Sequence, residues 1–506
     1  MAPLFRRRCL ACSIFAVVLI ATVSSLPKAE EPPRRRTLSS ASQERIAELQ
    51  ARIARLSASS DYAAAVPLAE EVVALHGDEL GAKHHETVSQ QAALDTVRKL
   101  SAATPQQQKA WTEGMLAVTN ALAERGPESS ERALAACRKL LEIGESVLGA
   151  DHAYTALVHS KIGDVLEDAG RNREAESAYR KALKVLRTAL GDNHPYTAMC
   201  CNSLATVLQE EGDFAGAEAL YVSARETLAK TLGEEDPVTL TTLNNLGSNF
   251  YVRGKYREAE EVHRKVLAIR LKLFGEQDPG TVMSRGNVAA CVGGQGRLSE
   301  AEALMRETLA ACRKVHGEDH GETARYLNSL GNLLTRQNRA AEGVVHFRQA
   351  VLICRKVHGP AHPSTASAIN GLAFALDQQG LFAEAAPLFR EALTIWEKTL
   401  GPKHHNTARG YNNLAHGLDN QGYHLEAEAL LRRALAIWRE VQGEHQDTAT
   451  ALDNLADNLL FQARFKEAEE LARASLAMRR KVQGEQHLDT ATCARQLANV
   501  LSASGQ

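Results

Sequence analysis

The 506-residue chain is poor in aromatic side chains, which make up only 5% of its residues. This scarcity favours a core of Ala and Leu packed helix on helix over a β-sandwich or a barrel. The chain also lacks a charge imbalance, with 59 basic and 61 acidic residues and a formal net charge of -2. Without a global positive field, we expect no binding to nucleic acid.

The nine cysteines lack the spacings of metal and redox sites. Cys9 and Cys12 lie in the N-terminal leader, and the other seven show no CxxC spacing and are odd in number. We therefore expect neither a disulfide framework nor a zinc site, and interpret these cysteines as small residues on helix faces. The chain has no GxSxG, HExxH, GxxxxGK[ST] or GxGxxG motif in a strand-to-helix context. We expect no catalytic residue, no cofactor and no bound metal, and interpret the chain as a non-enzyme.

Residues 1–29 have the pattern of a signal peptide. They contain no acidic residue, carry three arginines at 6–8 and continue with the apolar run CLACSIFAVVLIATVSSL. Cleavage is expected after Ser25 or Ala29. The run is also long enough for an uncleaved membrane anchor, a tether through residues 9–26. The expected localisation is exported, meaning secreted, periplasmic or membrane-anchored, with a cytoplasmic or organellar location as the alternative.

A less regular region separates the leader from the rest of the chain. Residues 30–57 are predicted to form a linker and a short amphipathic helix, in which four apolar residues from Ile46 to Leu56 recur at spacings of three, four and three. Because this seam is barely two heptads long, an ordinary helix is favoured over a coiled coil. Residues 58–148 are interpreted as degenerate N-terminal repeats with an insertion at Ala103–Ser130, which holds one additional helix.

From residue 149 the chain repeats with a fixed period. A glycine recurs every 42 residues, and only the step to Gly484 is one residue shorter. These glycines are Gly149, Gly191, Gly233, Gly275, Gly317, Gly359, Gly401 and Gly443. Apolar or small residues at three- and four-residue spacings predict two amphipathic helices in each period. Residues 149–488 are therefore predicted to form eight tandem helix pairs, and residues 489–506 a C-terminal capping helix.

Small residues recur at two places within each pair. A second glycine falls between the two helices, where a left-handed backbone ends a helix at no cost to glycine. Asn338 and Ala463 replace this glycine in two copies, and we expect the copy with Ala463 to have the least ideal turn. An alanine recurs on the second helix where two helices approach closely. These alanines are Ala175, Ala217, Ala259, Ala301, Ala385, Ala427 and Ala468.

Histidine recurs three residues after the loop glycine, at His152, His194, His320, His362 and His404. The pair His316 and His320 has the four-residue spacing of helical metal ligands, but Gly317 interrupts the helix between them, and other copies have Asp instead. We therefore interpret these histidines as helix-start or loop-packing residues. Trp396 and Trp438 stand one period apart, which indicates packing between successive units.

The repeat resembles the tetratricopeptide repeat. Its 42-residue period, with NNLA at 412–415, GYHLEAE at 422–428 and RALAI at 433–437, is similar to the kinesin-light-chain subtype. The resemblance covers residues 60–100 weakly and 130–503 strongly. It implies an all-α fold, a right-handed superhelical solenoid of tetratricopeptide-type helix pairs with a concave groove.

In that family the first helix of each unit lines the concave face, so the resemblance places one side chain per repeat in the groove. At this position stand Asn202, Asn244, Asn328, Asn370 and Asn412, with interruptions at Ser160, Gly286 and Asp453. An amide donates and accepts, so such a ladder can hold the backbone of an extended peptide. The alternative is that each asparagine bonds a neighbouring helix and only joins the repeats. The two interpretations are compatible with each other.

Charged and polar residues accompany this ladder on the same face. Arg325 and Arg409 stand one turn before the asparagine position, and Asn420 follows one helical stretch later. An arginine in the groove can bind an acidic side chain or a terminal carboxylate. Solvated groove charges are the alternative interpretation.

The predicted function is a non-enzymatic protein-protein interaction scaffold, which binds an extended peptide segment of an unidentified protein partner in the concave groove. One alternative is a structural or self-assembling spacer protein in the envelope or secreted. A further alternative is a kinesin-light-chain-type cargo adaptor, although such light chains carry a long N-terminal coiled coil and the seam from Ile46 to Leu56 is short. The sequence identifies neither the partner nor the oligomeric state.

Replacing Ala427 with Phe tests the role of the small residues. The larger side chain is expected to push the helices apart and to lower the free energy of unfolding by about 1 to 3 kcal/mol. Urea unfolding followed by circular dichroism measures the change. An unchanged midpoint would contradict close packing at this position.

Overall fold

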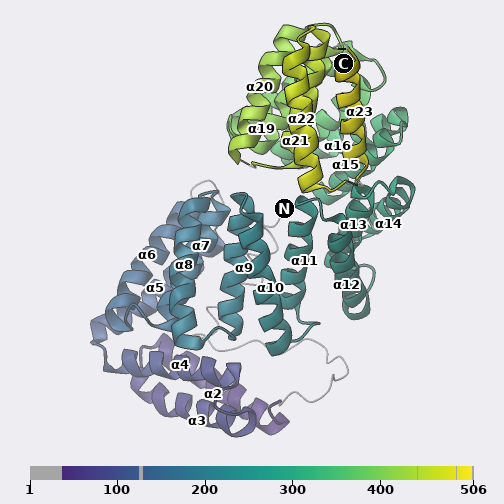
Figure 1. Ribbon diagram of the computed structural model, residues 1–506. Coiled ribbons are helices and arrows are strands. Elements are labelled where there is room, and N and C mark those ends of the chain that lie inside the picture. The colour runs from purple at the N-terminus through teal and green to yellow at the C-terminus, as the bar shows by residue number, and fades with distance from the viewer. Residues whose placement is uncertain (1–36, 125–128, 442, 486, 504–506) are drawn as a thin grey trace. The chain divides into compact units, whose positions relative to one another are not determined.

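The computed structural model describes residues 37–124, 129–441, 443–485 and 487–503 (Figure 1). In these ranges the regular structure consists of 22 helices and no strand, which confirms the predicted all-α solenoid of helix pairs. The predicted leader and membrane tether lie outside the described residues. No helix in the described ranges combines the length and the apolar character needed to cross a bilayer.

The chain divides into two compact units, one up to Thr242 and the other from Leu243, and the division falls within α11 (Pro237–Val252). The other helices of unit 1 are α2 (Ser40–Ala58), α3 (Tyr62–Leu80), α4 (His85–Ala102), α5 (Pro105–Ala123), α6 (Ser129–Val147), α7 (Ala153–Asp168), α8 (Asn172–Leu190), α9 (Pro195–Glu210) and α10 (Phe214–Thr231). The first part of unit 2 consists of α12 (Tyr256–Phe274), α13 (Pro279–Gly294), α14 (Leu298–His316), α15 (Gly321–Arg336), α16 (Ala340–His358) and α17 (Pro363–Asp377). The second part consists of α18 (Phe382–Leu400), α19 (His405–Asp419), α20 (His424–Val441), α21 (Gln446–Phe461), α22 (Phe465–Val482) and α23 (Leu488–Ala503).

The three N-terminal helices α2, α3 and α4 share a core of their own. Ile46, Leu49 and Ile53 of α2 are buried in it, and Leu56 packs against it. The apolar seam of α2 is therefore covered within the chain, as expected for an ordinary helix. Figure 1 shows these helices at the purple end of the chain, and α5 occupies the segment that the sequence marks as an insertion.

The turn between the helices of a pair has the predicted left-handed residue. Gly422 has φ of +85°, and its N–H donates to the carbonyl oxygen of Asp419 at 2.9 Å, while the next N–H, of Tyr423, donates to Leu418 O at 3.0 Å. Asn338 and Ala463 adopt the same conformation, with φ of +62° and +58°. Ala463 therefore has the strained turn that the sequence predicts, because a Cβ is disfavoured there.

The loop histidines begin the first helices as N-caps. In His152 the Nδ1 atom accepts from the N–H of Tyr154 at 3.2 Å, and the same bond recurs at His194, His320, His362 and His404. The interpretation as helix-start residues is confirmed, and Asp278 replaces histidine by accepting from Thr281 N at 2.7 Å. Burial lowers the pKa of His194 to about 4, so this cap is neutral at pH 7.

The core of unit 2 is continuous from Val282 to Val500. The repeated alanines are fully or almost fully buried, and Ala301 and Ala427 are 0% exposed. Trp396 and Trp438 are also buried, as predicted for packing between successive repeats.

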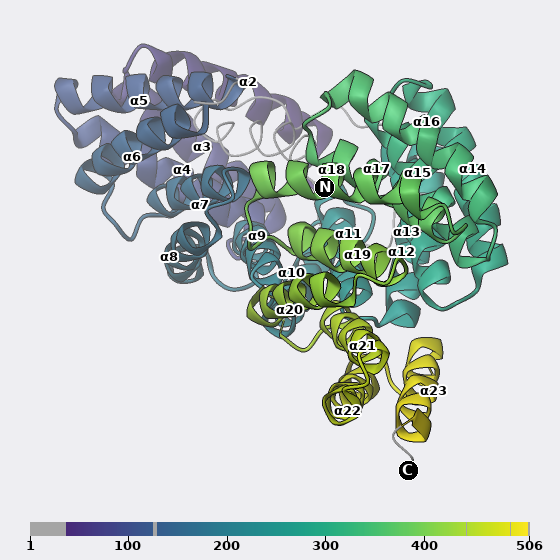
Figure 2. The ribbon, with the colours of Figure 1, turned by 90° about the horizontal axis from the view of Figure 1, so that it is seen from above.

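The two helices of a pair have different neighbours. First helices contact one another, as α15 does with α17 and α17 with α19. They form an inner layer, and Figure 2 shows α13 and α15 on the inner side of α14 and α16. Along unit 2, inner first helices therefore alternate with outer second helices.

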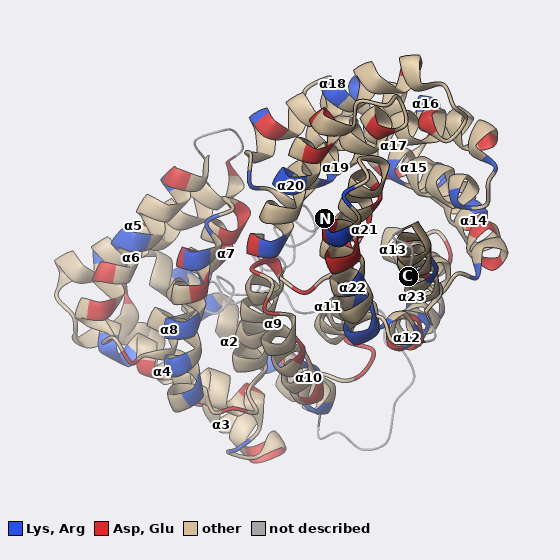
Figure 3. Cartoon of the chain, turned by 45° about the horizontal axis from the view of Figure 1, so that its top comes forward, with Lys and Arg blue, Asp and Glu red and all other residues tan. Residues whose placement is uncertain are grey.

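The second helices carry basic and acidic residues mixed along their length (Figure 3). Glu302 of α14 accepts hydrogen bonds from Gln337 and Arg339 of the next pair, each at 2.8 Å. The same cluster recurs around Glu260 and around Glu428. These bonds between glutamates and arginines of neighbouring repeats partly explain why basic and acidic residues are nearly equal in number.

Replacing Ala463 with Gly is expected to relieve the strained turn. The free energy of unfolding should rise by about 1 kcal/mol, because a left-handed alanine costs more than a left-handed glycine. The matched control is Gly422→Ala, which should lower it by a similar amount. Chemical denaturation of both variants measures the two changes, and a destabilised Ala463→Gly variant would contradict the explanation.

Candidate functional site

The inner layer of unit 2 presents four positions on each first helix. On α15 these are Arg325, Ser329, Asn332 and Arg336, which follow one another at spacings of four, three and four and therefore share one face. The last of them, Arg336, donates from Nη1 to Gly293 O of the neighbouring first helix α13 at 3.1 Å. We call the surface formed by these positions on α11, α13, α15, α17, α19 and α21 the inner face.

Four of the five asparagines proposed for peptide binding stand on the first helices that form this face, and the five are not equally exposed. Asn370 and Asn412 are buried, with 8% and 5% of their surfaces exposed. Asn202, Asn244 and Asn328 are half-buried. The first of these, Asn202, lies in unit 1 on α9, and the other four belong to unit 2.

Three of these asparagines bond the next repeat through their side-chain oxygens. Each oxygen accepts from the Nδ2 of another asparagine, which stands one position later in the following first helix. The pairs are Asn287 to Asn244 at 2.9 Å, Asn413 to Asn370 at 3.1 Å and Asn454 to Asn412 at 2.9 Å. These bonds join the repeats, so at least one lone pair of each Oδ1 atom is committed within the protein.

The donors of these pairs were not among the predicted site residues. The sequence signal for them is the doubled asparagine, seen at Asn412 and Asn413, in which the first amide accepts from the following repeat and the second donates to the preceding one. The bonded asparagines are 42 or 43 residues apart in the sequence, and this spacing indicates a contact only when the structure places neighbouring first helices side by side.

The helix α15 lacks these pairs on both sides. Its Asn328 faces Gly371 of α17, which has no side chain to donate, and Asn328 Oδ1 is buried without a partner in the described part of the chain. A Cβ at Gly371 would lie 2.3 Å from Cε1 of Phe347. On the other side, a Cβ at Gly286 would lie 2.5 Å from Cε1 of Tyr326. Buried aromatic rings thus replace the asparagine pairs at α15.

The two proposed arginines are held by local partners. Arg325 donates to Glu322 at 2.6 Å and lies over the ring of Tyr326, with its guanidinium carbon 4.1 Å from the ring centroid. Arg409 donates to Asn406 Oδ1 at 2.8 Å and lies over the ring of Trp396 at 5.3 Å. Burial lowers the pKa of Arg409, and its Nε has no partner in the described structure.

Asn420 belongs to a polar cluster where α17, α19 and α21 meet. Its Nδ2 donates to Oδ2 of the buried Asp377 at 3.1 Å, and His416 Nδ1 lies 3.1 Å from the same oxygen. The hydrogen bond to Asp377 raises the pKa of His416. Burial raises the pKa of the neighbouring Asp419, which accepts from Asn458 at 2.6 Å. The carboxylate of Asp377 thus lies beside the inner-face positions of His416 and Asn420.

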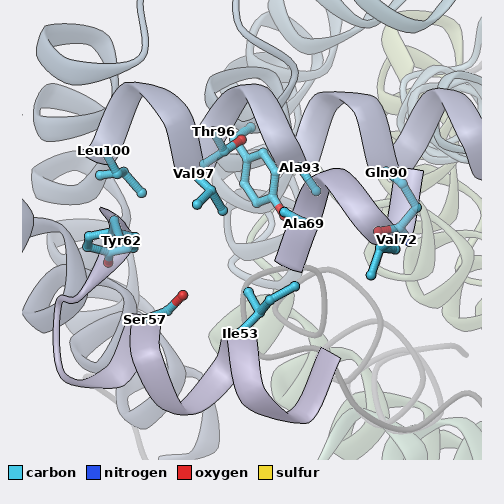
Figure 4. Close-up of a pocket in the computed structure, with 11 residues that line it drawn as sticks. Ile53, Ser57, Tyr62, Ala69, Val72, Gln90, Ala93, Thr96, Val97 and Leu100 are labelled. Atoms are coloured by element: carbon cyan, nitrogen blue, oxygen red, sulfur yellow. The ribbon is translucent and has the colours of Figure 1, made fainter. Parts of the chain in front are cut away.

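A small pocket lies outside the inner face, in unit 1 between α2, α3 and α4 (Figure 4). Its lining is mostly apolar and includes Ile53, Val72 and Val97, and the buried hydroxyl of Tyr154 has no partner among the described residues. The space suffices for about one water molecule. We interpret it as a packing gap of the N-terminal helices.

The asparagine pair between α17 and α19 can be tested by a double-mutant cycle. Asn413→Ala should lower the free energy of unfolding by about 1 kcal/mol, because the buried Asn370 oxygen loses its donor. Asn370→Ala in the Asn413→Ala background should cost less than in the wild type. The control is Asn328→Ala, whose side-chain oxygen has no hydrogen-bond partner in the described structure, and this change should cost less than Asn370→Ala in urea unfolding. Equal costs would contradict the pairing.

The titration of His416 gives a second test. Its raised folded pKa means that the His416–Asp377 contact stabilises the fold fully below the ordinary histidine pKa of about 6.5, and that this stability is lost as the pH rises through the folded value. NMR titration of the imidazole should give a pKa above 6.5 in the wild type. In Asp377→Asn the pKa should fall, because burial then dominates. A value unaffected by this substitution would contradict the assignment.

Comparison with known proteins places this geometry in a family. The family model of the tetratricopeptide repeat matches residues 112–188, 157–230, 196–272, 238–314, 280–342, 323–397, 367–422 and 411–481. No curated protein is similar enough to be counted as a relative.

Several solved structures are similar to parts of the chain. The nearly identical TPR-like repeats of a kinesin light chain from Podosopora anserina are 26% identical, covering 41% of this chain and 99% of that one with a TM-score of 0.34. BtubC from P. vanneervenii is 19% identical over 48% of this chain and 92% of its own, with a TM-score of 0.34. A Rap protein complexed with competence and sporulation factor is 13% identical over 79% and 98%, with a TM-score of 0.42. Because the family model matches most of the chain, the chain belongs to the tetratricopeptide-repeat family.

Proposed function

We propose that this chain is a non-enzymatic scaffold that binds an extended segment of another protein along the inner face of its first helices. One observation carries the proposal: residues that join repeats recur, whereas the partly exposed positions of the inner face differ from repeat to repeat. At the position of His416 the other repeats have Ser248, Ala290, Asn332, Phe374 and Asp457. A surface that varies over a constant framework suits selection of one partner.

The asparagine ladder has a narrower role in this proposal. The oxygens of Asn244, Asn370 and Asn412 each accept a bond from a neighbouring repeat, so the ladder fixes the spacing of the first helices. A partner backbone then meets amide groups of fixed orientation, which reduces the entropy lost on binding. Selectivity comes from the variable positions, with Asn332 and Arg336 exposed on α15 and Asp457 half-buried on α21.

The mixed charge of the inner face sets the kind of segment that it takes. Arg336 is exposed near α13, whereas Asp419 and Asp457 belong to the acidic cluster near α21. We propose a segment with an acidic residue toward α15 and a basic residue toward α21, because each would then meet the opposite charge.

We also propose that the chain is exported, on the basis of its leader at residues 1–29. N-terminal sequencing of the purified protein from its source tests this part. A chain that begins at Met1 or Ala2 in the cytoplasmic fraction would contradict it.

Partner capture followed by mass spectrometry tests the inner face. The variant Asn332→Ala with Arg336→Ala is expected to lose the proteins that the wild type retains. The matched control changes an arginine and an amide on the outer helix of the same pair, Arg348→Ala with Gln349→Ala, both exposed on α16. This control should retain the wild-type partners.

The three asparagines Asn328, Asn370 and Asn412 are changed together to Ala in a separate variant, whose fold is checked by circular dichroism. Loss of binding with an intact helix signal supports a direct role for the ladder. Recovery of the same partners by the α15 variant and the wild type, with both folded, would contradict binding at the inner face.

A further inference from the structure

Segments of unit 2 that are far apart in the sequence contact each other. His445 Nε2 donates to Val252 O at 3.1 Å, and Tyr256 Oη donates to Gln446 Oε1 at 2.9 Å across 190 residues of sequence. The rings of Tyr256 and His487 lie 6.1 Å apart. The turn between α11 and α12 therefore packs against the chain segments that precede α21 and α23.

This contact joins two different edges of the solenoid. We call the edge formed by the turns within helix pairs the turn edge, and the edge formed by the loops between pairs the loop edge. Val252 and Tyr256 belong to the turn edge, and His445 and His487 to the loop edge. The two edges lie at opposite ends of the helices, and unit 2 shows that they are complementary.

The turn edge of later pairs carries exposed apolar side chains. They are Leu381, Tyr423, Leu425 and Phe461, which are 41%, 58%, 77% and 64% exposed. The ring of Phe461 stacks on His424 at 5.2 Å, which joins α21 to the turn before α20. We call these four residues the apolar turn edge.

The repeat register relates this edge to the contact inside unit 2. Phe461 stands at the position of Val252, and Tyr423 and Leu425 stand at those of Lys255 and Arg257. In other pairs the position of Leu381 and Tyr423 holds Arg297, Arg339 or Arg464, each paired with glutamates of the second helices. Phe461 is exposed in the register of the contact residue Val252. Leu381 and Tyr423 are exposed apolar residues at a position that forms ion pairs in other repeats. Together these side chains indicate an association surface.

The loop edge supplies matching donors. A histidine cap accepts at Nδ1, so its ring proton is on Nε2 and remains available for a further bond. His152 uses it toward Asp95 Oδ2 at 3.0 Å, and His445 toward Val252. For His320, His362 and His404, the described ranges contain no partner of Nε2.

We propose that the apolar turn edge binds the loop edge of a second copy of this chain, repeating between molecules the contact seen inside unit 2. The surfaces differ, so the association is head-to-tail and extends to open chains of molecules. It uses an edge of the solenoid, and Phe461 is the one residue of the apolar turn edge that also stands at an inner-face position.

Sedimentation velocity of the full chain over a concentration series tests this association. The wild type should gain mass with concentration. The turn-edge variant combines Leu381→Arg, Tyr423→Arg and Leu425→Lys, in which each new residue is the one found in the same register at Arg339, Arg464 or Lys466. It should fold and should associate at least about tenfold more weakly. The control, Val345→Arg with Leu352→Arg, adds two positive charges at exposed apolar positions of α16 and should associate as the wild type does.

A loop-edge variant identifies the other surface. His320→Asp, His362→Asp and His404→Asp keep a capping group, as Asp278 does, and remove the Nε2 donor. This variant should also associate more weakly. Mixed with the turn-edge variant, it should form dimers and nothing larger, because only one intact edge of each kind remains.

Three results would overturn the proposal. The first is a wild type that stays monomeric up to its solubility limit. The second is a folded turn-edge variant that associates as the wild type does, which is also the result expected if the leader drives association. The third is a mixture of the two edge variants that forms no dimers although the wild type associates.

Discussion

This structure depends on one constraint: neighbouring helices approach each other closely at small residues, alanine and glycine. Ala301, Ala385 and Ala427 are almost fully buried between helices, and Phe347 fills the space that a side chain at Gly371 would take. Because each repeat contacts mainly its neighbours, the separation at these contacts determines how the first helices lie side by side. That separation in turn decides which polar side chains of successive repeats can reach one another.

Much of the fold can be predicted from the sequence because its determinants are local. The turn glycines, the strained Ala463 and the capping histidines are each explained by backbone geometry within a few residues. The packing of α4 against the start of α7 could not be predicted, because the N-terminal repeats are degenerate and the bond from His152 to Asp95 spans 57 residues. Periodicity carries no information where the period is lost.

The candidate site was predicted only in part, since its residues depend on contacts between repeats. The sequence shows the asparagine positions, but it does not show whether Asn370 and Asn328 have the same role. One accepts from Asn413 and the other faces Gly371. Arg409 is likewise held over Trp396 and bonded to Asn406, which the sequence spacing does not reveal. The inner face therefore combines a rigid polar framework with a smaller set of variable side chains.

The buried cysteines make local opening of the helices detectable as thiol reactivity. Seven free thiols, from Cys137 to Cys493, are buried at intervals along the described chain. Burial raises the pKa of Cys291 and Cys137 to about 12 and that of Cys493 to about 11, so thiolate is scarce while the helices stay closed. A repeat array can open locally from its ends, and each thiol then becomes reactive only when its own helices separate. The set of cysteines that are modified first would identify the repeats that open first.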